Sequence, residues 1–431
     1  MQSSPPEPGP SEGWSGYLKA LGPGLLWAGA AIGVSHLVQS TRAGAEYGFS
    51  LVWMILLCLA LKYPLFEYGH RYTAATGENL VQGYRRLGKL DLWIFLVLCI
   101  VSGFIALSAV TFFTGALVAN LLPIFPPDLE AAHWSAILLV FCLFILVMGR
   151  FAWLDGLVKL VILVLTVSTV VAAAAAFYNG PAGDPNAPIP PLATTTFLVF
   201  LVALLGWMPA PIEFAAISSL WINQRAAVTR HRITLSEALF DFRVGYLTTA
   251  VLSVFFVSLG ALVMFGTGEA FSNRATAFSA QLIDLYTKTI GDWAAPVINI
   301  AAVAAMFSTT ITVMDGYPRA IDATLAELWP GYRQKFRPKA ALSAWLIVAA
   351  VVAAAIIYFF RGQFVLLITI ATCLGFLAGP IFGWINLRLV SSSFMPPEHR
   401  PGKLLVAMSW AGIVLLTVVG LAYVFELAGA I

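Results

Sequence analysis

The amino-acid sequence predicts an all-α integral membrane protein, and three observations carry this prediction. Of the 431 residues, 60% are hydrophobic and only 10% are charged, whereas soluble domains carry about 25% charged residues. The mean hydropathy is +0.88. Eleven apolar segments are long enough to cross a bilayer, and two of them, at matching places in the chain, are interrupted by Gly and Pro.

The eleven segments follow one another along the chain and divide it into two halves. A polar, Pro-rich stretch precedes the first segment, and we expect residues 1–20 to form a disordered cytoplasmic tail. Spans 1–5 occupy residues 21–178, spans 6–10 occupy residues 195–390, and span 11 occupies residues 403–428. The predicted spans are 22–42, 47–75, 91–122, 134–150, 152–178, 195–221, 243–268, 293–316, 341–360, 364–390 and 403–428.

Lys and Arg residues alternate between the ends of these spans. Eighteen of the 24 positive charges fall at one set of ends, four fall at the opposite ends, and Lys62 and Lys159 fall inside spans. Positive charge is retained on the cytoplasmic side of a membrane. The alternation therefore predicts a cytoplasmic N-terminus and an external C-terminus, and we expect a bacterial plasma (inner) membrane location.

Several function classes find no support in the sequence. No P-loop pattern is present, which argues against ATP-driven transport. The four cysteines stand singly in apolar stretches, so we expect buried thiols and no metal cluster. The basic segment from Asn223 to Arg243 is expected to lie along the inner leaflet. We therefore expect no enzymatic activity, no cofactor and no nucleic-acid partner, and the partners should be the lipid bilayer and a small solute or cation.

Spans 1 and 6 are the interrupted ones. Span 1 contains Gly-Val-Ser-His at residues 33–36, and span 6 contains Gly206, Pro209 and Pro211. Proline lacks a backbone N–H and cannot continue a regular helix, and irregular backbone is tolerated at membrane depth only where protein or water satisfies it. Paired interruptions in two five-span halves are typical of inverted-repeat transporters, with the substrate site between the broken helices.

Four sequence blocks resemble the Nramp metal-transporter family. They are "LGPGLLWAGAAIGVSHLVQSTRAGAEYGFS" (Leu21 to Ser50), the Thr-Gly at residues 76–77, "WMPAPIEFAAISS" (Trp207 to Ser219) and "FSTTITVMDGYPRA" (Phe307 to Ala320). The resemblance implies the LeuT-type fold: two inverted five-helix repeats plus an eleventh helix, with helices 1 and 6 broken. It also implies secondary active transport, with a divalent cation as substrate.

The chain departs from the family at the residues that would bind this metal. The family's first-span motif is Asp-Pro-Gly-Asn, whose Asp and Asn ligate the ion; here Gly33 stands at the Asp position and His36 at the Asn position. In the sixth span Met208 is retained, but Ala210 and Ala215 stand where the family has histidines. Without a carboxylate ligand, the site does not supply enough binding free energy to offset the dehydration of a divalent cation. Binding of Mn²⁺ or Fe²⁺ is therefore expected to be much weaker than in the family.

Two acids are candidates to replace the lost carboxylate or to couple transport. Glu213 lies within span 6 and Asp315 lies at the end of span 8, and intramembrane acids are functional candidates by default. The structural alternatives are an ion pair with another span for Glu213 and an i,i+4 pair with Arg319 for Asp315. For His36 the alternative is a ring hydrogen-bonded to the backbone of the break. Lys62 is expected to pair with Glu67 or with another helix.

Three functions remain open at this stage. The first is a cation carrier, with His36 and Met208 as metal ligands and Glu213 completing the site. The second is a LeuT-type carrier of a small organic or anionic solute, and the third is a sensor that does not transport. The predicted substrate-binding residues are Gly33, Ser35, His36, Gly206, Met208 and Glu213, and the candidate coupling residues are Asp315 and Glu213.

Overall fold

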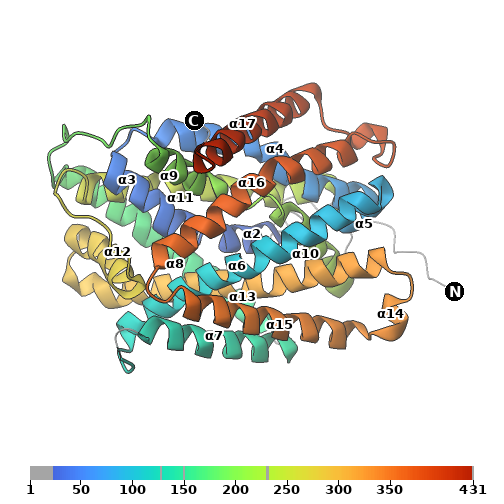
Figure 1. Ribbon diagram of the computed structural model, residues 1–431, viewed down its shortest axis with the longest axis horizontal. Coiled ribbons are helices and arrows are strands. Elements are labelled where there is room, and N and C mark those ends of the chain that lie inside the picture. The colour runs from blue at the N-terminus through green and yellow to red at the C-terminus, as the bar shows by residue number, and fades with distance from the viewer. Residues whose placement is uncertain (1–22, 127–128, 149–150, 230–232, 430–431) are drawn as a thin grey trace.

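The computed structural model describes residues 23–126, 129–148, 151–229 and 233–429, and this part of the chain is helical, with turns and loops and no strand. The long helices run roughly along one axis of an elongated bundle (Figure 1). The helices are α2 (Pro23–Ala31), α3 (Thr41–Tyr47), α4 (Val52–Thr76), α5 (Leu80–Leu87), α6 (Lys89–Leu121), α7 (Glu130–Val147), α8 (Phe151–Asn179), α9 (Thr195–Gly206), α10 (Phe214–Thr229), α11 (Leu235–Val263), α12 (Ala275–Ile290), α13 (Ala295–Leu328), α14 (Tyr332–Lys335), α15 (Pro338–Phe359), α16 (Phe364–Val390) and α17 (Lys403–Leu427).

The predicted spans correspond to these helices in order. Among the described residues, eight unbroken helical stretches are long and apolar enough to cross a membrane. Span 5 is α8, whose residues 163–179 form a shorter apolar stretch. Span 1 is divided into α2, a π-helical segment η1 (Ser35–Ser40) and α3, and span 6 is divided into α9 and α10. The predicted fold of eleven spans with the first and sixth broken is therefore confirmed.

The structure differs from the prediction at several helix ends. Helix α11 begins at Leu235, eight residues before the predicted span, because Thr234 and Glu237 form a capping box there. Helix α13 continues to Leu328, well past the predicted end. The basic segment that was expected to lie along the inner leaflet is instead divided between the end of α10 and the first turns of α11, with residues 230–232 outside the described part.

Three helices, α5, α12 and the four-residue α14, were not predicted, because none is apolar and long enough to be recognised as a span. Helix α5 is an amphipathic segment that Asn79 and Gln82 start with a capping box. Helix α12 buries Phe278 and Leu282, and it packs against α6 and α8. The four cysteines are buried and free, as predicted.

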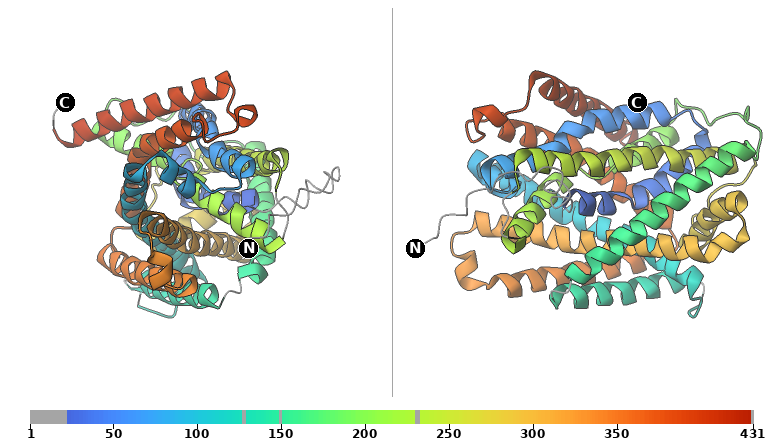
Figure 2. Two further views of the ribbon diagram at one scale, coloured as in Figure 1. Left: turned by 90° about the vertical axis from the view of Figure 1, so that its right-hand side faces the viewer. Right: turned by 180° about the vertical axis from the view of Figure 1, so that it is seen from behind.

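Helix α2 lies in the interior of the bundle, where it packs against α10, α11 and α13 (Figures 1 and 2). Helices α7, α15 and α17 lie at the periphery (Figure 1). The continuation of span 1 is held by a close glycine contact: a Cβ on Gly44 would lie 2.0 Å from the Val257 carbonyl oxygen, and one on Gly260 would lie 2.1 Å from that of Thr41. Small residues allow such approach of helix backbones in membrane proteins. The contact fixes α3 against α11 and so positions the first break.

Candidate substrate site between the broken helices

The break in span 1 is short. Helix α2 ends at Ala31, the chain bends at Ile32 and Gly33, and helical structure resumes at Val34 and continues as the π-helical segment η1. A Cβ on Gly33 would lie 2.9 Å from Thr309 Cγ2, so the glycine permits close approach to α13. The prediction that span 1 is unwound over residues 33–36 is therefore wrong for Val34, Ser35 and His36, which are helical. Their backbone turns again because the Gly33 carbonyl accepts the N–H groups of His36 and Leu37.

The polar groups of this break bond to one another. Ser35 Oγ lies 2.9 Å from both Ala31 O and His36 Nδ1, and 3.2 Å from Pro209 O in the other break. His36 Nδ1 lies 2.9 Å from Ala31 O, and His36 Nε2 lies 2.9 Å from Thr249 O of α11. A neutral ring that donates from Nε2 to the Thr249 carbonyl accepts the Ser35 hydroxyl at Nδ1, and neither proton then goes to the Ala31 carbonyl. Both ring nitrogens of His36 thus have partners within the protein.

The break in span 6 is longer. Helix α9 ends at Gly206, residues 207–213 form turns and bends, and α10 begins at Phe214. Pro209 and Pro211 supply no backbone N–H to a helix here. Gly206 is packed tightly, since a Cβ on it would lie 2.0 Å from the Thr372 carbonyl oxygen of α16. The predicted break at Gly206–Pro211 is present, and it extends two residues further.

Lys62 occupies the α9 end of this break. Its Nζ donates hydrogen bonds of 2.6 Å to Leu205 O and 3.0 Å to Gly206 O, and the residue is only 1% exposed. Its expected partner Glu67 instead binds Arg71. A positive group is favourable at this place, because the last carbonyls of a helix carry a partial negative charge. The sequence signal was a lysine at mid-span, but its partner carbonyls are far away in the chain.

Glu213 occupies the other end of the same break, directly before α10. Its Oε1 accepts hydrogen bonds from Ser102 Oγ at 2.9 Å and from Tyr317 OH at 3.0 Å. Its Oε2 is buried and has no hydrogen-bond partner in the described part of the chain. A carboxylate is favourable at a helix N-terminus, where the partial charge is positive. The two ends of the break therefore carry charges that oppose the partial charges of their own helices.

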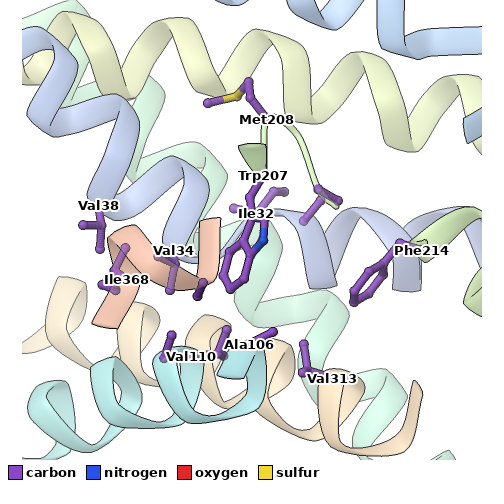
Figure 3. Close-up of a cluster of buried hydrophobic side chains, with 14 of the residues drawn as sticks. Ile32, Val34, Val38, Ala106, Val110, Trp207, Met208, Phe214, Val313 and Ile368 are labelled. Atoms are coloured by element: carbon purple, nitrogen blue, oxygen red, sulfur yellow. The ribbon is translucent and has the colours of Figure 1, made fainter. Parts of the chain in front are cut away.

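A small cavity of about 20 Å³ lies between the two breaks. This is room for about one water molecule. Its wall is mostly apolar, and its polar side chains are those of Ser35, Thr309 and Tyr317. Figure 3 shows the apolar cluster around it, with Trp207 pointing into the cluster. The lining residues are Ala31, Val34, Ser35, Ala106, Val110, Trp207, Pro209, Ala210, Pro211, Phe214, Thr309, Val313 and Tyr317.

The predicted site residues are only partly brought together at this cavity. Ser35 lines it, and Gly33 lies in the adjoining bend. Met208 is fully buried but points away from Trp207 and the rest of the cluster (Figure 3). Glu213 lies behind the wall, one hydrogen bond away through Tyr317.

Asp315 is paired elsewhere. It forms an ion pair with Arg319 and accepts a hydrogen bond of 3.0 Å from Trp221 Nε1. No cluster of three or more His, Cys, Asp or Glu side chains that could hold a metal occurs among the described residues. The cavity wall presents hydroxyl groups and apolar side chains, and the Glu213 carboxylate lies behind Tyr317.

Comparisons with known proteins agree with this architecture. The family model "Natural resistance-associated macrophage protein-like" (Nramp) matches residues 24–426. An uncharacterized protein of Pasteurella multocida is 38% identical over 421 residues, which cover 96% of this chain and 94% of that protein.

Two solved structures share the fold at low sequence identity. A manganese transporter of Eremococcus coleocola, solved with an aromatic bis-isothiourea substituted compound, has a TM-score of 0.66 at 15% identity, covering 98% of this chain and 90% of that chain. The structure of MhsT in complex with L-phenylalanine has a TM-score of 0.61 at 12% identity, covering 92% of this chain and 98% of that chain. The chain therefore belongs to the Nramp family and is a membrane transporter with the LeuT-type fold.

Proposed function

We propose that this protein is a secondary transporter that carries a small, uncharged organic solute between its two helix breaks, and that its site has lost the family's affinity for transition metals. The observation that carries the proposal is the chemistry of the break in span 6. Lys62 stands at the α9 end and Glu213 stands at the α10 end. A cation approaching the first end and an anion approaching the second would each meet a like charge.

The first break supports the loss of metal affinity. Gly33 supplies no carboxylate where the family has one, and the ring nitrogens of His36 already have partners at 2.9 Å. Met208 does not line the cavity. A divalent cation would exchange its bound water for neutral dipoles alone, and these do not offset the free energy of dehydration.

The cavity wall supports an organic solute. Sites for such ligands are mostly apolar, with a few polar groups that fix orientation. Here the side chains of Trp207 and Phe214 supply aromatic surface, while Ser35, Thr309 and Tyr317 supply hydroxyls. MhsT, which shares the fold, was solved in complex with L-phenylalanine. Because the cavity holds about one water molecule, a solute enters only when the breaks move apart, as alternating access requires.

Glu213 is the candidate coupling residue. Its free Oε2 can take up a proton, and Tyr317 joins its Oε1 to the cavity wall. Asp315 is the weaker candidate, because Arg319 already neutralises it. A cation carrier is the second candidate function, and the same free carboxylate oxygen favours it, since it is an available anionic ligand close to the cavity.

The charge distribution supports one orientation in the membrane. The basic residues of α5, α14 and the end of α16 lie at the same end of the bundle, on the right in Figure 1. With these ends in the cytoplasm, the N-terminus is cytoplasmic and the C-terminus is external. The relative from Pasteurella multocida supports a bacterial plasma membrane as the location.

The test compares ligands that differ in charge but not in shape. Purified protein is screened by thermal unfolding with benzamide, benzoate and benzylamine, with their smaller counterparts acetamide, acetate and ethylamine, and with Mn²⁺. Neutral members are expected to raise the melting temperature, and Thr309→Val should reduce that rise, measured against its own ligand-free melting temperature because the change also removes the hydrogen bond to the Gly29 carbonyl. Stabilisation by Mn²⁺, or by only the charged members, would contradict the proposal.

A further inference from the structure

The environment of Lys62 resembles an ion site that the protein fills with its own side chain. The ammonium group is buried and contacts two carbonyl oxygens, Leu205 O at 2.6 Å and Gly206 O at 3.0 Å. Because α9 ends there, neither carbonyl is bonded by an N–H one helical turn further on; the Leu205 carbonyl is approached by the backbone N–H groups of Trp207 and, at 3.4 Å, Met208. Two carbonyls of a helix end thus face a single positive charge.

Carbonyls at the broken ends of half-helices bind the coupling cation in carriers of this fold. Such an ion is exchangeable, and its binding couples solute movement to the ion gradient. A lysine supplies the same positive charge to the same kind of carbonyl but cannot leave. The stem of Lys62 comes from α4 (Val52–Thr76), which packs against α10, α11 and α16, so the group is anchored by a neighbouring helix.

We propose that the Lys62 ammonium group is a tethered cation that replaces an exchangeable coupling cation at the C-terminal end of α9. The break in span 6 then stays formed without sodium, and sodium does not drive transport through this protein. The groups that act on the ammonium are the carbonyl dipoles of Leu205 and Gly206, and beyond them the Cys58 thiol and the carboxyl group of Glu213. The proposal does not depend on the solute, because ion binding alone tests it.

The experiment measures thermal unfolding in chloride salts of sodium, methylammonium and choline at equal ionic strength. Choline is the reference because it is too large for the space that Lys62 fills. The wild-type protein should have one melting temperature in all three salts. Lys62→Ala removes the charge and opens a void beside two carbonyls, which should lower the melting temperature by about 5 °C or more. Methylammonium or sodium should then restore part of this loss, whereas choline should not.

Two further variants separate charge from packing. Lys62→Met fills most of the space without a charge, so it should be destabilised and should not respond to any of the salts. Cys58→Ala makes a small void at the same Leu205 carbonyl, which Cys58 Sγ approaches at 3.9 Å, and it should also show no salt response. If Lys62→Ala aggregates in choline chloride but can be purified in methylammonium chloride, that recovery counts as restoration of stability by the small cation.

Four results would overturn the proposal. They are stabilisation of the wild-type protein by sodium, Lys62→Met as stable as the wild type, Lys62→Ala with the same loss in every salt, and Lys62→Ala aggregated in every salt. In the last two cases Lys62 would be a packing residue only. None of these results bears on the uncharged solute, which the ligand series tests separately.

Discussion

At the break in span 1 the bonding side chains are neutral, whereas the break in span 6 has a charged side chain at each of its ends. At the first, Ser35 and His36 lie within hydrogen-bond distance of each other, of the Thr249 carbonyl of α11 and of the facing break. At the second, Lys62 and Glu213 stand at the two helix ends. Both breaks are irregular backbone inside the bundle, where every polar group must find a partner.

The difference concerns charge. In the first break Gly33 carries no side-chain charge, and hydroxyl and imidazole groups bond to the backbone there. In the second break the helix ends would still attract ions, and the protein's own side chains now satisfy them. If the Lys62 proposal holds, the breaks keep their shape without a bound ion.

The largest effect is expected at the charged break, for Glu213→Ala. This change leaves the hydroxyls of Tyr317 and Ser102 without their buried carboxylate acceptor. A hydrogen bond to a charged group contributes about 1.5–3 kcal/mol, so the loss of both should show as a large destabilisation in thermal unfolding. Glu213→Gln keeps an acceptor of the same shape and should fold nearly normally. In proteoliposomes, however, its solute uptake should no longer respond to a pH gradient, and gradient-driven uptake by Glu213→Gln would remove Glu213 from the coupling role.

A smaller effect is expected at the neutral break, for His36→Ala. The change leaves the Thr249 carbonyl without its ring donor and opens a void at a fully buried position. Loss of a buried hydrogen-bond partner costs about 1–3 kcal/mol, less than loss of a buried charge partner. Unfolding of His36→Gln, which keeps a donor, is the matched control. Should His36→Ala destabilise the protein more than Glu213→Ala, the contrast between the breaks would be wrong.

The smallest effect is expected for Ser35→Ala, which removes the contact between the two breaks. The hydroxyl has one proton for three nearby acceptors, so its loss should cost about 1 kcal/mol. Ser108→Ala is the control, because that hydroxyl bonds only to Phe104 O of its own helix. Hydrogen exchange of the Gly33–Leu37 amides should be faster in Ser35→Ala and unchanged in the control. Equal exchange in both variants would show that the two breaks are not linked.

The sequence predicted the broken helices because Gly and Pro act locally and their paired positions are visible along the chain. It also offered the Asp315–Arg319 pair as an alternative, because an i,i+4 spacing is a local relation. The π-helical turn at Ser35 and His36 was missed, since Gly33 alone suggested a longer unwound stretch. The role of Lys62 was missed because its partner carbonyl is 143 residues away. The direction of the Met208 side chain depends likewise on how α9 and α10 are joined, which spacing does not reveal.

Calorimetric titration of Mn²⁺ into the wild-type protein and into Gly33→Asp tests whether the site has lost the family's affinity for transition metals. The new Cβ would lie 2.9 Å from Thr309 Cγ2, so the Thr309 side chain must shift to accommodate it. Titrations at two pH values on either side of about 6.5, the ordinary pKa of histidine, would reveal a ligand role of His36. The Eremococcus coleocola manganese transporter is the positive control. The account predicts no Mn²⁺ binding by the wild-type protein at either pH and measurable binding by Gly33→Asp. Wild-type binding as tight as that of the control would contradict it.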